Sequence, residues 1–196
     1  RSYRPNSFVA LFMWWAWLCG LTVVCMIASP AVALMHTDPD TARITSQGFL
    51  WALALASIAF CIAVVAAVPV WILIYRSWAQ IQDGHARTTP GAALGLCFIP
   101  LFNIYWVFVA FRGLALDANA FITRYGFEAP RIPVGLALAY CIVFVCIYVP
   151  FLNVLAIFAG IPLLFAVLLK IANSSAAIAE FLDTPPVAPP TSPATS

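Results

Sequence analysis

The chain has 196 residues, of which 64% are hydrophobic and only 8% are charged. Because a soluble domain carries roughly 25% charged residues, this composition excludes a water-soluble body and predicts an all-α integral membrane protein. A net charge of +2 without a Lys/Arg cluster excludes a nucleic-acid partner, and six cysteines inside apolar runs without His at ligand spacing predict no metal site and no cofactor.

Two membrane helices are expected in the first half of the chain. Residues 8–28 are continuously apolar and give about 31 Å of helix, which suits one crossing, and Pro30 is expected to end it. A polar loop leads to a second helix over 48–75, whose length of about 42 Å requires it to tilt or to project past the hydrocarbon. Trp78 follows that helix and is expected in an interfacial aromatic belt.

The second helix carries a face of small residues. Alanines recur along it at spacings of four, three, four and three residues, at Ala52, Ala56, Ala59, Ala63 and Ala66. Such a face lets another helix backbone approach closely, so it is expected to be a helix-packing interface. The alternative is chance periodicity in an Ala-rich helix.

The run Gly91–Phe111 can be placed in two ways. It is interrupted at Pro100 and Asn103, so it either crosses the membrane or folds back as a re-entrant hairpin that continues into an amphipathic helix over 112–124. A crossing divides the nine basic residues five to four between the two sides, whereas a hairpin places eight on one side. The positive-inside rule therefore favours the hairpin with cytoplasmic termini, although Trp106 would suit the far interface of a crossing.

A second apolar run, Val134–Leu169, is too long for one straight crossing and is broken at Pro150 and Asn153. The expected elements are two helices and a Pro-rich tail, over 134–149, 154–182 and 183–196. Residues 1–182 thus form a single membrane domain with about four transmembrane helices and a re-entrant hairpin.

The two Pro-x-x-Asn breaks are the candidate functional feature. Pro100 and Pro150 disfavour helix in the preceding residue, and Asn103 and Asn153 can cap the helices that follow. Irregular backbone at membrane depth must be buried in protein or line a cavity, so both breaks are expected to face protein. One interpretation is that the helix starts hold a polar or anionic ligand, as in transporters. The other is that each Asn caps a structural turn.

Three charged residues follow the first break. Asp117 and Arg124 lie seven residues apart on one helix face, where they can pair directly or extend toward the membrane surface. Arg112 follows eight apolar residues and can extend to headgroups, bind an anionic lipid or pair with a partner protein.

A family resemblance rests on the stretch Tyr75–Asn119, which contains Thr89-Pro90-Gly91, Gly95, Phe98-Ile99-Pro100, Phe102-Asn103, Tyr105-Trp106 and Asp117. This stretch resembles a family of uncharacterised bacterial multi-pass membrane proteins with a PG-x-A-x-G-x-x-FIP-x-x-N core, some of which carry a GYF-like domain ahead of it. The resemblance covers about a quarter of the chain and implies a location in the bacterial inner membrane. It implies no activity.

The preferred functional hypothesis is a non-catalytic accessory or structural subunit that contacts lipid and packs against other subunits of a larger bacterial membrane complex. The alanine face and the scarcity of ionisable groups within the apolar runs favour it. The alternative is a transporter or channel for a small solute, an ion or a lipid that uses the two breaks. Since the chain has no motif for a nucleophile, a metal or an acidic dyad, an enzyme is not expected.

Overall fold

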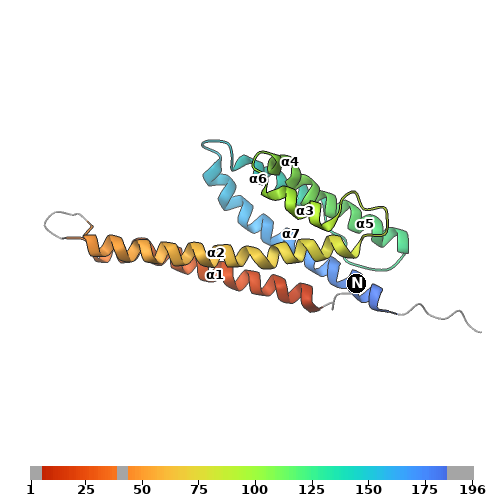
Figure 1. Cartoon of the computed structure of the whole chain (residues 1–196), viewed down its shortest axis with the longest axis horizontal. Coiled ribbons are helices and arrows are strands. Elements are labelled where there is room, and N and C mark those ends of the chain that lie inside the picture. The colour runs from red at the N-terminus through yellow and green to blue at the C-terminus, as the bar shows by residue number, and fades with distance from the viewer. Residues whose placement is uncertain (1–5, 39–43, 185–196) are drawn as a thin grey trace, which may run out of the picture.

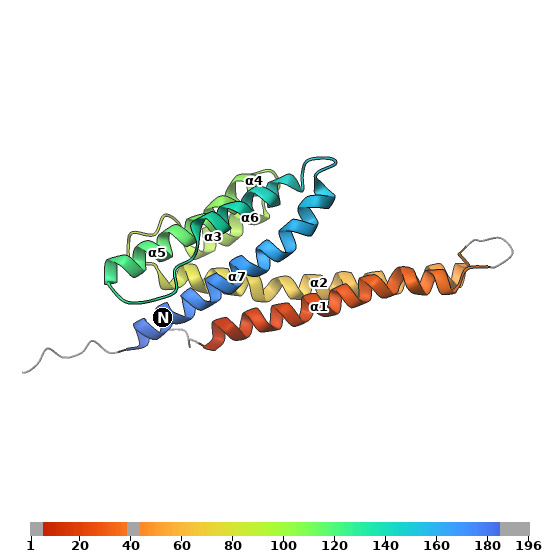
Figure 2. The ribbon, with the colours of Figure 1, turned by 180° about the vertical axis from the view of Figure 1, so that it is seen from behind.

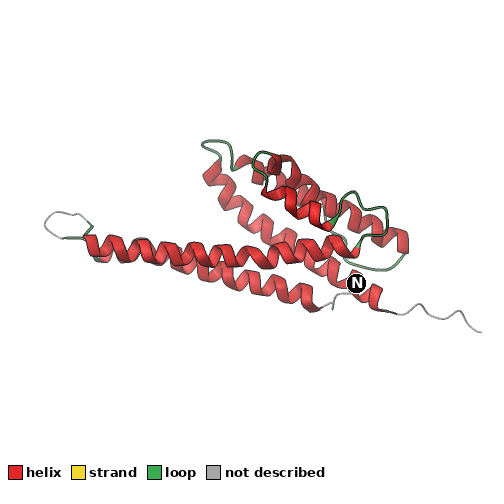
Figure 3. Ribbon diagram, viewed as in Figure 1, coloured by secondary structure: helices red, strands yellow, loops and turns green. Residues whose placement is uncertain are grey.

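A computed structural model describes residues 6–38 and 44–184 of the chain (Figure 1). The regular elements within these ranges are helices (Figure 3), and the protein is an all-α integral membrane protein. In the described part of the chain, the helices long and apolar enough to cross a membrane are Asn6–Met35, Ser46–Gln80, Phe102–Tyr125 and Leu155–Asp183. The predicted Pro-rich tail lies outside the described residues from position 185 onward.

The first two helices, α1 (Asn6–Met35) and α2 (Ser46–Gln80), form one long antiparallel hairpin (Figures 1 and 2). The prediction that Pro30 ends the first helix is wrong, because α1 continues through it to Met35. A proline is tolerated inside a membrane helix where a neighbouring helix supports the backbone. Here the hydroxyl of Ser29 donates a hydrogen bond to the Ala52 carbonyl of α2 over 2.8 Å.

The alanine face of α2 is divided between two environments. Ala59 and Ala66 are each only 3% exposed, and Ala52 is half-buried where Ser29 of α1 contacts its carbonyl. Ala56 and Ala63 are exposed. Small side chains therefore allow α1 and α2 to pack closely within the chain, and the two outward-facing alanines leave part of the face open.

The remaining helices form a C-terminal lobe, residues 90–183, that packs against only one half of the α1–α2 hairpin (Figures 1 and 2). This half holds the start of α1 and the end of α2, and the described ends of α5 and α7 lie at the same end of the molecule. The other half, toward the α1–α2 loop, extends beyond the lobe. The molecule is thus two helices thick at one end and a bundle at the other.

The first hairpin of the lobe turns back at residues 99–101. Its first leg is α3 (Pro90–Gly95) with the 3-10 helix η1 (Leu96–Phe98), and its second leg begins with α4 (Phe102–Val107). The indole N–H of Trp106 donates to the Ala92 carbonyl over 3.0 Å and joins the two legs. Trp106 therefore has a role within the folded-back arrangement and does not require a far interface.

The second leg does not stop at the lobe surface. It continues as the π-helix η2 (Phe108–Gly113) and α5 (Leu114–Tyr125), so the amphipathic segment 112–124, predicted to continue from the hairpin, is part of one helix over 102–125. This helix takes the place of 134–149 among the candidate spans, because α6 (Val134–Cys146) has only 13 residues.

The second hairpin joins α6 to α7 (Asn153–Asp183), with the turn at residues 147–152. In both hairpins the residue after proline has a positive φ, 63° at Leu101 and 72° at Phe151. The prediction that both asparagines are N-caps is wrong: Asn103 and Asn153 lie inside the first turn of their helices, and no side-chain cap is present at either start. The reversed φ already turns the chain, so the helix begins before or at the asparagine.

Trp78 marks where the lobe meets α2. Its side chain is 0% exposed, and its indole N–H donates to the Ala110 carbonyl over 3.2 Å. The expectation that Trp78 lies in an interfacial belt is therefore wrong. The buried indole N–H is thus satisfied by a carbonyl of the π-helix η2, which joins the lobe to α2.

Candidate functional site

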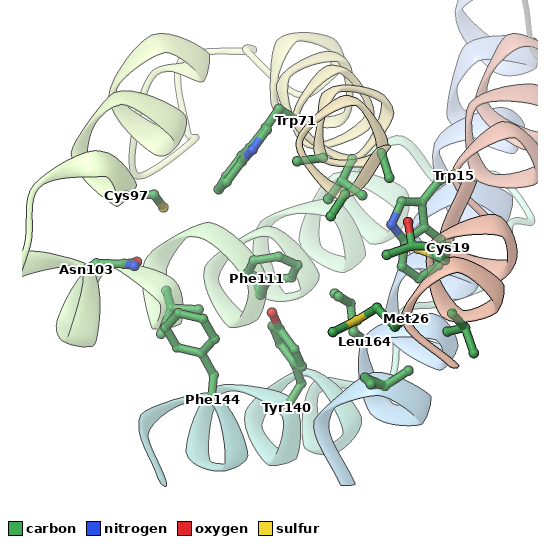
Figure 4. Close-up of a pocket in the computed structure, with 18 residues that line it drawn as sticks. Trp15, Cys19, Met26, Trp71, Cys97, Asn103, Phe111, Tyr140, Phe144 and Leu164 are labelled. Carbon is green, nitrogen blue, oxygen red and sulfur yellow. The ribbon is translucent and has the colours of Figure 1, made fainter. Parts of the chain in front are cut away.

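A cavity of about 500 Å³ lies between the α1–α2 hairpin and the lobe (Figure 4). This volume falls within the range of small-molecule sites, which is roughly 300–1,000 Å³. Its lining comes from both sides of that junction: Trp15, Cys19, Thr22, Val23, Met26, Ala63, Ala66, Ala67, Val70, Trp71, Cys97, Asn103, Val107, Phe111, Tyr140, Phe144, Ile161 and Leu164.

The cavity has a closed base and an open rim. Val107 and Phe111 at the base are 2% and 5% exposed, whereas Met26 and Ile161 at the rim are 64% and 61% exposed. These rim residues belong to α1 and α7, which are both candidate membrane spans. The opening therefore lies between two helices that are long and apolar enough to cross a membrane.

Asn103 is the first of two polar side chains of interest in this lining. Asn103 is the second residue of α4 and is half-buried, and its side-chain amide points into the cavity (Figure 4). Among the described residues, no hydrogen bond is made by that side chain. An amide transferred to apolar surroundings without a partner costs about 1–3 kcal/mol on protein scales, so this group favours a ligand or water that bonds to it.

Tyr140 of α6 is the second polar side chain of interest in the cavity lining. Its ring packs against Phe111 at a centroid distance of 4.8 Å, and its hydroxyl is directed toward the cavity (Figure 4). The residue is 8% exposed, and within the described ranges its hydroxyl has no hydrogen-bond partner. Tyr140 is not among the site residues predicted from the sequence, because a single tyrosine within an apolar run carries no signal of its own.

The chemistry of the lining is uncharged. Of the 18 residues that form it, none has a charged side chain. Aromatic rings from α1, α2, η2 and α6 supply broad apolar surfaces, including Trp15, Trp71 and Phe111. Such a site accommodates an apolar body and a small uncharged polar group, and it offers nothing to balance a phosphate or a carboxylate.

The other residues of the two breaks lie away from the cavity. Pro100, Pro150 and Asn153 are exposed, so the expectation that both breaks face protein is wrong. The turns pair part of their own backbone groups, which lowers the cost of leaving them without contact to other protein. The Phe102 amide donates to the Pro100 carbonyl over 2.7 Å, and the Leu152 amide donates to the Val149 carbonyl over 3.2 Å.

A network of charges covers the polar end of the lobe. Asp117 Oδ1 accepts from both Nε and Nη2 of Arg87 in the α2–α3 loop, at 2.9 and 2.7 Å, and Arg124 pairs with Asp83 of the same loop. Of the two alternatives considered for Asp117 and Arg124, the direct pair is therefore not the one found, because each of them pairs with a residue of the loop. Each of these side chains instead fastens the loop to α5.

Asp83 is held in its ionised form by its neighbours in this network. Partial burial opposes its ionisation, but the backbone amide of His85 and the guanidinium of Arg124 outweigh that effect and hold the pKa of Asp83 below its usual range. Its side chain is 10% exposed. The carboxylate is thus held charged by neighbours that belong to a loop and a helix far apart in the sequence.

Arg112 lies in the π-helix and is half-buried. Its Nε atom is buried without a hydrogen-bond partner in the described part of the chain. The next residue, Gly113, leaves room for Arg87, whose Cδ would lie 3.1 Å from a Cβ placed at that position. Arg112 therefore sits beside the charge network without belonging to it, and the lipid or partner contact expected for it stays a prediction.

In the described ranges, no three His, Cys, Asp or Glu side chains are grouped so that they could hold a metal ion. No protein-family model, no curated protein and no solved structure matches the chain. The family resemblance therefore stays a prediction, and the cavity is the feature on which a function can be argued.

Proposed function

We propose that the protein is a non-catalytic membrane protein that binds an uncharged, lipid-soluble molecule taken directly from the bilayer. The molecule would have an apolar body and a hydroxyl or carbonyl group. One observation carries the proposal: the Asn103 amide and the Tyr140 hydroxyl, both without protein partners, face the same apolar cavity (Figure 4).

The selection of an uncharged group follows from the lining. An ionised headgroup in this cavity would lose its hydration without meeting an opposite charge, at a cost of several kcal/mol. A hydroxyl or carbonyl needs only one or two hydrogen bonds. An amide provides both a donor and an acceptor, and a tyrosine hydroxyl provides the same pair, so the two side chains can serve either kind of group.

Entry from the side follows from the rim. The exposed residues Met26 and Ile161 lie on membrane-spanning helices, so the opening is in contact with lipid tails. A lipid-soluble molecule therefore reaches the cavity without crossing water. This route also explains why the rim is apolar although the cavity holds the amide of Asn103 and the hydroxyl of Tyr140.

Photocrosslinking tests the proposal. The purified protein is reconstituted in lipid vesicles with a diazirine-bearing diacylglycerol or, separately, a diazirine-bearing phosphatidylglycerol. We expect the uncharged probe to label cavity peptides at least about tenfold more than the anionic probe, which corresponds to about 1.4 kcal/mol. Excess unlabelled diacylglycerol should suppress this labelling. Equal labelling by both probes, or labelling that does not saturate, would contradict the proposal.

A matched pair of variants controls for nonspecific lipid contact. Ala63 and Ala56 are both exposed alanines of α2, two helical turns apart, but only Ala63 lines the cavity. Ala63→Phe is expected to fill the cavity and to reduce labelling, whereas Ala56→Phe should leave it unchanged. Tyr140→Phe removes only the hydroxyl and should weaken retention of the uncharged probe while the fold is kept.

The accessory-subunit role expected from the sequence stays a prediction. The exposed Ala56 supports the accessory-subunit role, because a small residue on an outward helix face permits close approach of a helix from another protein. Isolation from the native membrane in mild detergent, followed by mass spectrometry, tests this role. A protein that is recovered only as a monomer or homo-oligomer would count against it.

The transport alternative also stays a prediction. Binding from the bilayer would be its first step, and the geometry gives that step to Asn103 alone, since Asn153 is exposed at the other turn. Flux that depends equally on both asparagines would therefore point to a different site from the cavity.

A further inference from the structure

The cavity lining also contains two indole N–H groups that lack an acceptor. Trp15 of α1 and Trp71 of α2 reach into the cavity (Figure 4), and within the described ranges neither indole N–H has a hydrogen-bond partner. Trp15 is 7% exposed, so its N–H is largely withdrawn from the surrounding lipid. An indole nitrogen can donate a hydrogen bond but cannot accept one. These two groups therefore favour a bound molecule that brings acceptors.

The other polar groups of the lining leave this excess of donors in place. The hydroxyl of Thr22 already donates to the Leu18 carbonyl over 2.9 Å, so only its oxygen is available, as an acceptor. The Asn103 amide and the Tyr140 hydroxyl can each donate or accept. A carbonyl oxygen accepts and brings no proton of its own, whereas a ligand hydroxyl brings a proton that needs an acceptor. The lining as a whole therefore suits carbonyl groups better than hydroxyl groups.

The donors stand on opposite sides of the cavity. Figure 4 shows Asn103 of α4 on one side and Trp15 of α1 on the other, with Phe111 and Tyr140 between them. A single polar group at the end of an acyl chain reaches only one of these sides. Two carbonyls on opposite edges of one ring reach both sides at once.

The walls between the donors are aromatic. The rings of Phe111 and Tyr140 lie 4.8 Å apart, and Trp71 extends toward Phe111 from α2 (Figure 4). Flat conjugated rings stack favourably on aromatic faces. This part of the lining therefore favours a planar ring over a flexible chain.

The remainder of the cavity suits an aliphatic tail. Along α1 the lining runs from Trp15 to Met26, which is about 16 Å of helix. Beyond Thr22 it consists of Val23 and Met26 on α1, and Ile161 of α7 lies at the same exposed rim. A ring held near Trp15 can thus extend its tail toward the rim and the lipid.

We propose that the ligand of this cavity is a quinone, a planar ring with carbonyls on opposite edges and an aliphatic tail, and that the oxidised form is bound in preference to the quinol. The proposal rests on the proposed function, because it names the ligand class of the same cavity. The ring lies among Trp15, Trp71 and Phe111, and its carbonyls accept from donors on both sides. Reduction converts both carbonyls into hydroxyls and adds two protons to a lining that already has excess donors, so the quinol binds more weakly.

Competition with the two redox forms tests the proposal. The full chain in lipid vesicles is labelled with the diazirine-bearing diacylglycerol, in the presence of a para-benzoquinone with a decyl tail that is either oxidised or reduced with borohydride. All ring positions of this probe are substituted, because Cys19 and Cys97 line the cavity and thiols add to free positions. We expect the quinone to suppress labelling at a concentration at least about fivefold below that of the quinol.

The outcomes separate this proposal from the function on which it rests. Saturable labelling that the quinone does not suppress, or that both redox forms suppress equally, would overturn the quinone proposal and leave the proposed function standing. Labelling by diacylglycerol that does not saturate would contradict the proposed function, and the quinone proposal would fall with it.

A matched pair of tryptophan variants tests the role of the indole donor. Trp15→Phe keeps an aromatic ring and removes the N–H, and Trp14→Phe makes the same change at a residue that is 67% exposed and outside the cavity lining. The preference for quinone over quinol should fall at least about threefold in the first variant and stay as in the wild type in the second. Trp71→Phe repeats the test from α2 if Trp15→Phe fails to fold. An unchanged preference in the folded cavity variants would overturn the proposal.

Discussion

The two Pro-x-x-Asn turns have almost the same sequence and very different surroundings. Pro100-Leu101-Phe102-Asn103 and Pro150-Phe151-Leu152-Asn153 both reverse the chain through a positive φ after proline. Yet the amide of Asn103 faces the cavity, and Asn153 is exposed. The motif therefore determines the turn, and the helices on either side determine what the asparagine contacts.

The attachments to α2 differ as well. The first hairpin is held by the bond from Trp78 to the Ala110 carbonyl, and the second by a 2.7 Å hydrogen bond between Ser77 and Ser175. A large buried ring thus secures the hairpin that presents Asn103, and a pair of small hydroxyls secures the other.

The largest effect is expected for Trp78→Ala. It removes a fully buried ring and leaves the Ala110 carbonyl without its donor, so the free energy of unfolding should fall by about 3–5 kcal/mol. Ser77→Ala, which acts at the other hairpin, should cost only about 0.6–1 kcal/mol. Denaturation in mixed micelles compares the two, and similar losses would mean that the hairpins are held equally.

Asparagine substitutions come next. Asn103→Ala should weaken crosslinking of the diacylglycerol probe about tenfold, because one of two hydrogen-bonding groups in the cavity is lost, at about 1–1.5 kcal/mol. Asn153→Ala, the matched change at the exposed turn, should leave the labelling as in the wild type. Equal losses would show that the two turns act together and that the contrast between them is wrong.

Glycine at the positive-φ positions should stabilise both hairpins. Leu101→Gly and Phe151→Gly relieve about 1–2 kcal/mol of backbone strain in the folded protein. Glycine also raises the conformational entropy of the unfolded chain, which costs about 0.5–1 kcal/mol of stability. The free energy of unfolding should therefore rise by roughly 0.5–1 kcal/mol for each substitution. Thermal unfolding in vesicles measures it. A gain at one turn and a loss at the other would show that the turns are not equivalent.

The smallest effect concerns acid. The pKa of Asp83 is lower in the folded protein than the ordinary value of about 3.9, so its contribution to stability is present above that value and is lost as the pH falls through the folded pKa. A partly exposed pair of this kind contributes about 0.3–1 kcal/mol. Asp83→Asn should remove this part of the acid dependence, and an unchanged stability profile between pH 5 and pH 2 would show that the pair contributes nothing.

Sequence reasoning predicted the membrane class and the fold-back at Pro100, because composition and charge distribution are properties of the whole chain. It could not predict the roles of Trp78 or Tyr140, whose partners Ala110 and Phe111 lie about thirty residues away in the sequence. It also misplaced the ends of α1, since a proline in a membrane helix is supported by a neighbour that no local pattern reveals. The cavity itself has no sequence motif, because its lining is brought together by the packing of α1, α2, η1, α4, η2, α6 and α7.

The π-helix η2 has a consequence for how the chain tolerates length changes. It adds one residue to a turn and so rotates everything after it relative to everything before it. Asn103 precedes it and faces the cavity, and Asp117 follows it and binds Arg87. Deleting one residue from 108–113 would restore an ordinary helix of good local stability but turn one end away from its partner. The extra residue of η2 therefore sets the rotation of α5 about the helix axis relative to α4, so that Asn103 faces the cavity while Asp117 binds Arg87.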